Sequence, residues 1–253
     1  MVVSPTTVTA EELAPAEWSC TLLRVRQETP SVRTFFFTRP DLSWTFRPGQ
    51  YCVLTLAGVE DPRGSSRTFS LSSAPDDRDA LSITTRLGPS PFKTRLFSMK
   101  AGDPARLWGT FGSFVMDLER PAVLLGGGIG VTPFRSMVRQ LASSGTSRPV
   151  VFLCSSRTAD ELVFGGEMEA LADRQPWLRW LPTVTRSGEG TRPWSGRTGH
   201  IDAQLVRTLT AALDRPIYYL CGPPTMVGEL HRLLLREMRV PEPDTRTELF
   251  RGY

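Results

Sequence analysis

Residues 122–134 read AVLLGGGIGVTPF, which predicts a strand, a glycine-rich turn and the start of a helix. The apolar run from Ala122 to Leu125 is typical of a strand buried on both faces. The three glycines that follow have no Cβ atoms, so their backbone can approach a ligand closely. Pro133 suits a first helical turn, and residues 135–141 continue at helical spacing. Because a helix N-terminus attracts phosphate, this turn is a candidate site for a nucleotide pyrophosphate.

The turn differs from two common glycine motifs. Counted from Gly126, Val131 stands where the dinucleotide fingerprint G-x-G-x-x-G requires its third glycine or alanine. No lysine follows, which excludes a phosphate loop of the G-x-x-x-x-G-K-[ST] type. Close packing of the backbone would require the same glycines without any ligand, so both explanations stay open on this stretch alone.

The composition is that of a globular protein. Hydrophobic residues make up 40% and charged residues 22% of the 253, a length that suits two domains. The net charge is +4 and the basic residues are dispersed, so we expect no nucleic-acid binding. The chain contains no run of 18 apolar residues, so we expect no membrane span. The first 18 residues lack the pattern of a signal peptide. We therefore expect a cytoplasmic protein.

The chain has four cysteines, at positions 20, 52, 154 and 221. They form no C-x-x-C pair and show no spacing typical of zinc or iron–sulfur ligands. We therefore expect no metal site.

The first half of the chain carries the pattern of an antiparallel β-barrel. Residues 1–17 are rich in Thr, Ala, Pro and Glu and are predicted to form a flexible tail. Short strand-like runs follow, separated by Pro and Gly, at 19–26, 32–38, 51–56, 67–73 and 80–86. Strands this short and regularly spaced favour a barrel, which we assign to residues 18–118.

The second half alternates strands and helices, which predicts a doubly wound α/β domain with a parallel sheet over residues 119–253. After the opening strand and helix, further strands are expected at 149–153, 178–184 and 217–220, and helices at 159–171, 203–213 and 225–238. Ligands in such sheets bind beyond the carboxyl ends of the strands. The segments that follow the strands are therefore candidate binding segments: 126–132, 154–158, 185–187 and 221–224.

Five motifs occur in one order along the chain: F-x-x-G-Q-Y at 46–51, RTFSLSS at 67–73, GGGIGVTPF at 126–134, SRT at 156–158 and C-G-P-P-x-M at 221–226. In this order they resemble the ferredoxin–NADP reductase family of flavoproteins. The resemblance implies a β-barrel that holds FAD and an α/β domain that holds a nicotinamide dinucleotide. FMN is the less favoured flavin, and the preference for FAD rests on the resemblance alone.

The same resemblance implies the flavin contacts. Arg67 would pair with a flavin phosphate, Phe69 would lie along the isoalloxazine ring, and Ser70 would hydrogen-bond near N5. Phe69 replaces the family's usual tyrosine, which removes a hydroxyl and keeps the stacking ring. Lys93 or Thr94 would contact the flavin pyrophosphate, and Phe250 or, as an alternative, Tyr253 would cover the flavin. Further flavin contacts are expected from Thr68, Leu71, Ser72, Thr85 and Phe92.

The resemblance also implies the nicotinamide-nucleotide contacts. The turn residues Gly127, Gly128, Gly130, Thr132 and Pro133 would bind the pyrophosphate. The ribose end would meet Ser155, Ser156, Arg157, Thr185 and Arg186. Two arginines with hydroxyls favour a 2′-phosphate pocket and hence NADPH, with NADH as the alternative, although either arginine could simply lie in solvent. The nicotinamide would lie beside Cys221, Gly222, Pro223 and Met226. Cys221 could equally be a small buried hydrophobic residue.

The predicted function is that of a flavin-dependent reductase. A hydride would pass from NADPH to FAD beside Ser70 and Cys221, and single electrons would then leave to a separate protein. That acceptor would be a ferredoxin, a flavodoxin or an oxygenase component, because the chain lacks an iron–sulfur cysteine set. Two alternatives stay open: a reductase of free flavin or a small oxidant, and a regulatory protein that binds flavin and nucleotide without turnover.

Overall fold

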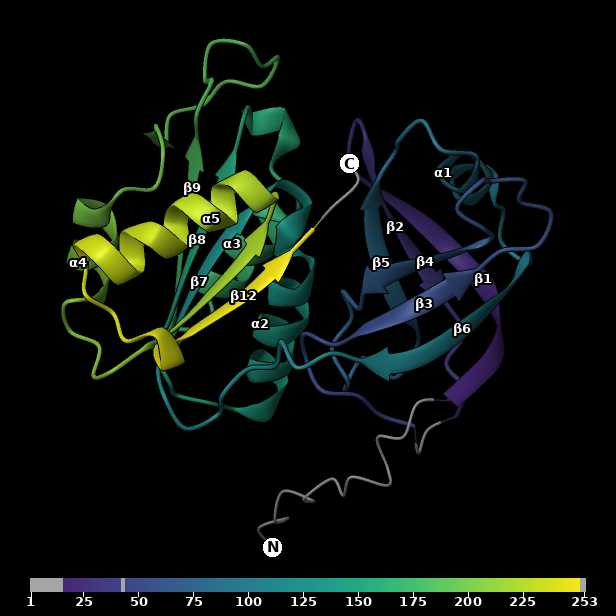
Figure 1. Cartoon of the computed structure of the whole chain (residues 1–253), viewed down its shortest axis with the longest axis horizontal. Helices are drawn as coiled ribbons and strands as arrows, with labels where there is room; N and C mark the ends of the chain where they lie inside the picture. The colour runs from purple at the N-terminus through teal and green to yellow at the C-terminus, as the bar shows by residue number, and fades with distance from the viewer. Residues whose placement is uncertain (1–15, 42–43, 251–253) are drawn as a thin grey trace, which may run out of the picture.

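The computed structural model describes residues 16–41 and 44–250, which form two six-stranded sheets side by side (Figure 1). One sheet is antiparallel throughout and the other is parallel throughout. The predicted fold class, a β-barrel followed by a doubly wound α/β sheet, is confirmed. Within the described residues, no helix is both long and apolar enough to cross a membrane.

The antiparallel sheet is built from β1 (Ala16–Thr29), β2 (Val32–Phe37), β3 (Tyr51–Thr55), β4 (Ser66–Ser70), β5 (Leu81–Arg86) and β6 (Pro104–Phe111). The strand order is β4-β3-β6-β1-β2-β5, and a single bridge between Leu71 and Ile83 joins the two outer ends into a barrel. Alternate residues of the strands point inward, so that Leu22, Phe35 and Leu54 are fully buried in its core. Helix α1 (Pro91–Ser98) follows β5 and is capped by the Ser90 side chain.

The parallel sheet is built from β7 (Ala122–Gly127), β8 (Val150–Ser156), β9 (Leu178–Val184), β10 (Arg197–Thr198), β11 (Ile217–Gly222) and β12 (Thr245–Leu249). Its order is β10-β9-β8-β7-β11-β12. One face packs against α2 (Thr132–Ser144) and α3 (Gly165–Ala172), and the other against α4 (Ala203–Thr210) and α5 (Pro224–Arg232). Because both faces are covered, every residue of β7 is buried, as its apolar run predicts.

Some element boundaries differ from the sequence-based prediction. Strand β1 begins at Ala16 and pairs there with β6, so Ala16 and Glu17 lie in a strand and not in a tail. The single helix expected at 159–171 is wrong: a short 3₁₀ turn, Ala159–Glu161, is followed by Phe164 at φ 59°, and α3 begins only at Gly165. Glycines at 165 and 166 are poor helix formers, and the left-handed residue before them interrupts the helical backbone.

The helix expected at 225–238 is also divided. Helix α5 continues into one π-helical turn, Leu233–Glu237, and a 3₁₀ turn, Glu242–Asp244, then leads into β12. Strand β12 lies beside β11, with Cys221 opposite Glu248 in the register. This pairing brings the end of the described chain to the carboxyl edge of the parallel sheet, where the glycine-rich turn also lies.

Candidate functional site

The glycine-rich turn connects β7 to α2. Gly127 ends the strand, residues Gly128–Val131 form a 3₁₀ turn, and α2 begins at Thr132 with Pro133 in its first turn. A Cβ on Gly130 would lie 2.3 Å from the backbone oxygen of Cys221, so this glycine is required by close packing. Gly128 has φ 54°, and a Cβ there would meet nothing within 4 Å. The turn therefore packs tightly against β11 on one side and leaves open space on the other.

A cavity of about 570 Å³ lies between the two sheets. The barrel side contributes Tyr51, Arg63, Arg67, Thr68, Phe69, Ser70, Thr84, Thr85, Gly88, Pro89, Ser90 and Lys93. The α/β side contributes Ile129, Thr132, Glu248, Leu249 and Phe250. The cavity thus brings the barrel segment 67–70 and the turn before α2 to one site, and its volume suits a cofactor.

The predicted flavin residues fall into three groups. Those that line the cavity are Arg67, Thr68, Phe69, Ser70, Thr85, Lys93 and Phe250. Leu71, Ser72 and Phe92 are fully buried behind its wall, and Thr94 lies on α1 with its hydroxyl donating to the Ser90 carbonyl. Tyr253 lies outside the described residues. The individual roles assigned to these residues stay predictions.

Arg67 lies along the cavity wall, and its guanidinium is already bound by neighbouring groups of the chain. Its guanidinium is 2.6 Å from a carboxylate oxygen of Asp61, and its Nη1 donates to the carbonyl of Gly64 at 2.8 Å. The backbone N–H of Arg63, with further help from Phe92 and Arg67, holds the pKa of Asp61 below its usual range. A flavin phosphate at this position would therefore share Arg67 with Asp61.

Lys93 supplies a second positive charge in the cavity. Its ammonium contacts the Thr85 hydroxyl and lies 5.1 Å from the centre of the Phe69 ring. Burial, with repulsion from Arg67 and Arg63, lowers the pKa of Lys93 to about 8. Three cations thus crowd one wall, an arrangement that favours an anionic ligand such as a pyrophosphate.

Glu248 lies on the opposite wall of the cavity, and no contact was predicted for it from the sequence. Burial raises the pKa of Glu248 to about 7, and its Oε2 has no hydrogen-bond partner among the described residues. An uncompensated buried carboxyl facing a cavity is a common feature of functional sites. Arg63 is a further cavity residue that lies outside every motif, and Tyr51, the last residue of the F-x-x-G-Q-Y motif, lines the cavity although no contact was predicted for it.

The predicted ribose residues lie at the carboxyl ends of neighbouring strands: Ser155 and Ser156 end β8, and Arg157, Thr185 and Arg186 come just after β8 and β9. The Thr185 N–H donates to the Ser156 carbonyl at 3.0 Å, and the Arg186 N–H donates to the Arg157 carbonyl at 2.7 Å. Both arginine side chains are exposed, and Arg186 Nη1 is 3.3 Å from Glu189. A smaller cavity of about 120 Å³ adjoins β8 and is lined by Ser155, Met226, His200, Ile201, Glu229, Leu230 and Leu233.

The predicted nicotinamide residues lie at the end of β11. Cys221 is fully buried and is not among the residues that line the larger cavity. Burial raises the pKa of its thiol well above the ordinary value, so the thiol is protonated at neutral pH and is not a nucleophile. Pro223 is exposed, and the Gly222 carbonyl accepts from the Phe250 N–H at 3.0 Å. The part of the chain that the structure describes contains no cluster of metal-ligating side chains.

We predict that Gly130→Ala costs more stability than Gly128→Ala. The first substitution forces β11 and the turn apart and should cost about 3 kcal/mol, whereas the second only strains the backbone by about 1 kcal/mol. Urea unfolding of both variants and the parent protein measures the difference. Equal losses would contradict the packing role of Gly130.

We predict that Glu248→Gln stabilises the protein at pH 8 and not at pH 5. The pKa of Glu248 is raised to about 7, so between pH 4.5 and 7 the unfolded chain loses this proton while the folded chain keeps it. The resulting penalty grows to about 3 kcal/mol at most and levels off above pH 7. Urea unfolding at the two pH values tests this, with the exposed Glu169→Gln as control. A gain that is the same at both pH values would refute the assignment.

Comparison with known proteins gives three similarities. Residues 124–232 match the family model of the oxidoreductase NAD-binding domain. The chain is 31% identical over 240 residues to ferredoxin–NADP reductase B of Sorangium cellulosum, covering 90% of this chain and 96% of the relative. It is also 31% identical over 218 residues to a glycine betaine monooxygenase reductase subunit of Chromohalobacter salexigens, covering 84% of this chain but 58% of that relative.

Among solved structures, the fold is similar to a ferredoxin–NADP⁺ reductase from Neisseria gonorrhoeae with bound FAD and NADP. The TM-score is 0.73 at 24% identity, and the match covers 92% of this chain and 98% of that one. This likeness supports the two-domain fold. The relative from Sorangium cellulosum, matched over nearly its full length at 31% identity, shows that the chain belongs to the ferredoxin–NADP reductase family, the NAD(P)H-dependent flavoprotein oxidoreductases.

Proposed function

We propose that this chain transfers a hydride from NADPH to FAD and passes single electrons to a separate protein acceptor. The observation that carries the proposal is the cavity whose walls come from both sheets, with Phe69 and Ser70 on one side and Thr132 on the other. Such a site can hold a flavin and a nicotinamide in contact. Relatives named as monooxygenase reductase subunits support an oxygenase component as acceptor, with ferredoxin or flavodoxin as the others.

The described residues fit a flavin nucleotide. Phe69 is 9% exposed and lines the cavity, so its ring is available to a flat ligand, while Arg67, Lys93 and Arg63 supply positive charge for phosphate. Ser70 is 7% exposed, so its hydroxyl is held in a nearly dry wall. When bound, the flavin supplies the chemistry of accepting a hydride and releasing single electrons.

The residues of this chain contribute positioning and charge. Ser70 would orient the flavin edge by a hydrogen bond, and Phe250 would cover its face until the nicotinamide arrives. Cys221 would shape the nicotinamide pocket through its backbone and its bulk, because its thiol is protonated. No general acid is needed for hydride transfer, so these contacts suffice for the proposed step.

The nucleotide preference follows from two exposed arginines. Arg157 and Arg186 follow adjacent strands and are joined through the backbone, so both guanidinium groups can reach one phosphate. This arrangement supports NADPH, with NADH as the alternative. The predicted flavin domain, 18–118, would be extended by Ala16 and Glu17 of β1, and residues 119–253 would form the nucleotide domain. A cytoplasmic location belongs to the proposal, and the four free, buried cysteines fit a reducing compartment.

We expect anaerobic addition of NADPH to bleach the absorption of the bound flavin. Subsequent addition of an oxidised ferredoxin should restore the colour through single-electron steps. A flavin that stays oxidised would refute the reductase function and favour a regulatory protein. Turnover with free flavin or dioxygen that equals turnover with ferredoxin would instead favour a reductase of small oxidants.

We predict that FAD affinity falls as the pH rises through about 8, because Lys93 then loses the charge that attracts phosphate. Lys93→Met should bind FAD about tenfold more weakly at pH 7, which corresponds to about 1.4 kcal/mol, and should lose most of the pH dependence. Flavin fluorescence titrations between pH 6.5 and 9 measure both effects. Lys100→Met is the matched control, since Lys100 is exposed. A wild-type affinity that does not change with pH would contradict the assignment.

A further inference from the structure

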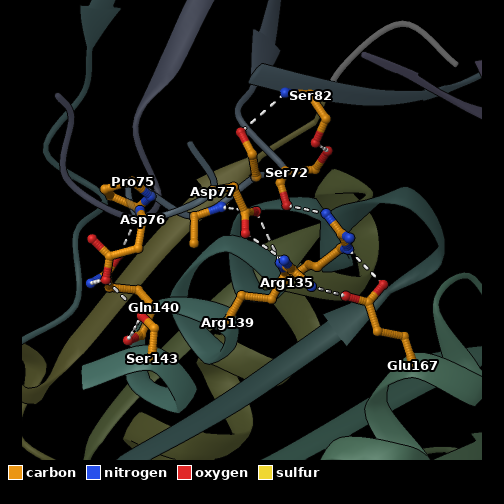
Figure 2. Close-up of polar contacts among 12 residues, drawn as sticks. Ser72, Pro75, Asp76, Asp77, Ser82, Arg135, Arg139, Gln140, Ser143 and Glu167 are labelled. Atoms are coloured by element: carbon orange, nitrogen blue, oxygen red, sulfur yellow. Dashed lines mark hydrogen bonds and ion pairs between the residues drawn. The ribbon is translucent and has the colours of Figure 1, made fainter. Parts of the chain in front are cut away.

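A buried arginine on α2 reaches from the nucleotide half of the cavity to the flavin half. Arg135 lies three residues after Thr132 and is only 4% exposed. Its Nη1 donates to the backbone carbonyl of Ser72 at 2.6 Å, and its Nε donates to Glu167 at 2.8 Å (Figure 2). One side chain therefore connects the helix of the glycine-rich turn with the RTFSLSS segment.

The charge of Arg135 is balanced inside the contact. Burial lowers the pKa of Arg135, but the carboxylate of Glu167 on α3 opposes this effect. Burial likewise acts to raise the pKa of Glu167, and Arg135 and Arg139 outweigh it, so the net pKa is lowered. Glu167 is therefore ionised, and its Oε2 accepts from Arg135 while its Oε1 accepts from Arg139. Arg26 of β1 also lies 3.5 Å from Oε2.

A second connection lies one helical turn further along α2. Arg139 Nε donates to Asp77 at 3.0 Å and Nη1 to Glu167 at 3.0 Å. Asp77 belongs to the loop after β4, and its carboxylate accepts the Ala74 N–H at 2.8 Å. Positions i and i+4 share one helix face, so both arginines point from α2 towards the barrel. Figure 2 shows them between Ser72 and Asp77 on one side and Glu167 on the other.

Each end of this connection is attached rigidly to a cavity wall. The Ser72 N–H donates to the Ser82 carbonyl at 2.8 Å, and its hydroxyl lies 2.9 Å from that of Thr84, a cavity residue. Ser70 lies two residues before Ser72 and also lines the cavity. On the other side, Thr132 lines the cavity one helical turn before Arg135. A shift of Arg135 would move one wall relative to the other.

Hydride transfer is sensitive to such a shift, because a misplacement of about 1 Å can reduce a rate by about a hundredfold. Buried ion pairs add little net stability compared with apolar contacts of the same size. The directional guanidinium contact is therefore better suited to fix the orientation of the two domains than to stabilise their association.

We propose that Arg135 is a positioning residue, which fixes the glycine-rich turn relative to the Ser70 wall through its contacts with Ser72 and Glu167, and that Arg139 supports it through Asp77. This inference rests on the proposed function. It adds residues that set the geometry between the flavin half and the nucleotide half of the cavity without contacting either cofactor.

The test compares Arg135→Lys with the parent protein. Lysine keeps the charge but cannot fork onto Ser72 and Glu167 together. At saturating NADPH, we expect the single-turnover rate of flavin reduction to fall about 10-fold to 100-fold, with the affinities for FAD and NADP⁺ changed less than about threefold. Arg120→Lys is the control. Arg120 also pairs with a carboxylate, Asp244, at 2.7 Å, its side chain is 27% exposed, and it does not line the cavity, so this variant should keep the parent rate.

A second readout does not depend on activity. Without nucleotide, Arg135→Lys should speed amide hydrogen exchange in residues 70–77 and 128–135 together and leave the rest of the chain unchanged. If this variant fails to fold, Arg139→Lys carries the test, because Arg139 is partly exposed and should give an intermediate loss of about 3-fold to 10-fold. Gln140→Ala, at the rim of the same contact, should reduce the rate of flavin reduction less than either arginine substitution.

An unchanged rate of flavin reduction in Arg135→Lys would overturn the inference. A rate that falls only in proportion to lost FAD binding would overturn it too, because it would assign Arg135 a purely structural role. Failure of the parent protein itself to be reduced by NADPH would instead refute the proposed function, and the exchange measurement would still decide whether Arg135 couples the two segments.

Discussion

The close contact between the glycine-rich turn and the end of β11 is the constraint on which the site depends. With no Cβ on Gly130, the turn can lie against the Cys221 carbonyl, and α2 then starts at the carboxyl edge of the sheet. That start places Thr132 on the cavity wall and Arg135 one turn behind it. Strand β12 pairs with the other edge of β11 and brings Glu248 and Phe250 to the same opening.

The charges of the cavity follow from this arrangement. The barrel wall carries Arg63, Arg67 and Lys93, and the carboxylate of Asp61 pairs with the two arginines, at 4.0 Å from Arg63 and 2.6 Å from Arg67. Burial, together with repulsion from Arg67 and Arg63, lowers the pKa of Lys93. An anionic ligand would relieve this repulsion. The carboxyl of Glu248 lies on the opposite wall, away from where phosphates would gather, and its raised pKa reflects burial in the absence of a cation.

The sequence predicted the parts of the structure that depend on local pattern. The apolar run of β7, the glycines after it and Pro133 each specify their own backbone, so the strand, turn and helix could be predicted from one stretch. Phe69 and Ser70 were identified by the resemblance, and the cavity includes both. The break at Phe164 was missed, although the two glycines that follow it are poor helix formers.

Other residues could not be predicted because their importance arises from long-range contacts. Arg135 reads as an ordinary position on an amphipathic helix, and only the fold shows its guanidinium against a carbonyl 63 residues earlier in the chain. Asp61 lies in a loop without a motif, and its pairing with Arg67 depends on the way that loop folds back. Glu248 lies in a short exposed-looking strand pattern, and its desolvation follows from burial that no local sequence encodes.

The contact between the two sheets combines apolar and polar parts that do different work. Phe114 follows the last barrel strand and packs against two rings of the α/β half. The centre of its ring lies 6.0 Å from that of Phe134 on α2 and 5.8 Å from that of Tyr219 on β11. Such apolar contacts supply most of the free energy of association, but they are non-directional and tolerate sliding. The guanidinium contacts of Arg135 and Arg139 are directional, because donors in a fixed plane must meet particular oxygens. The apolar contacts therefore hold the halves together, and the arginines determine at which relative position they are held.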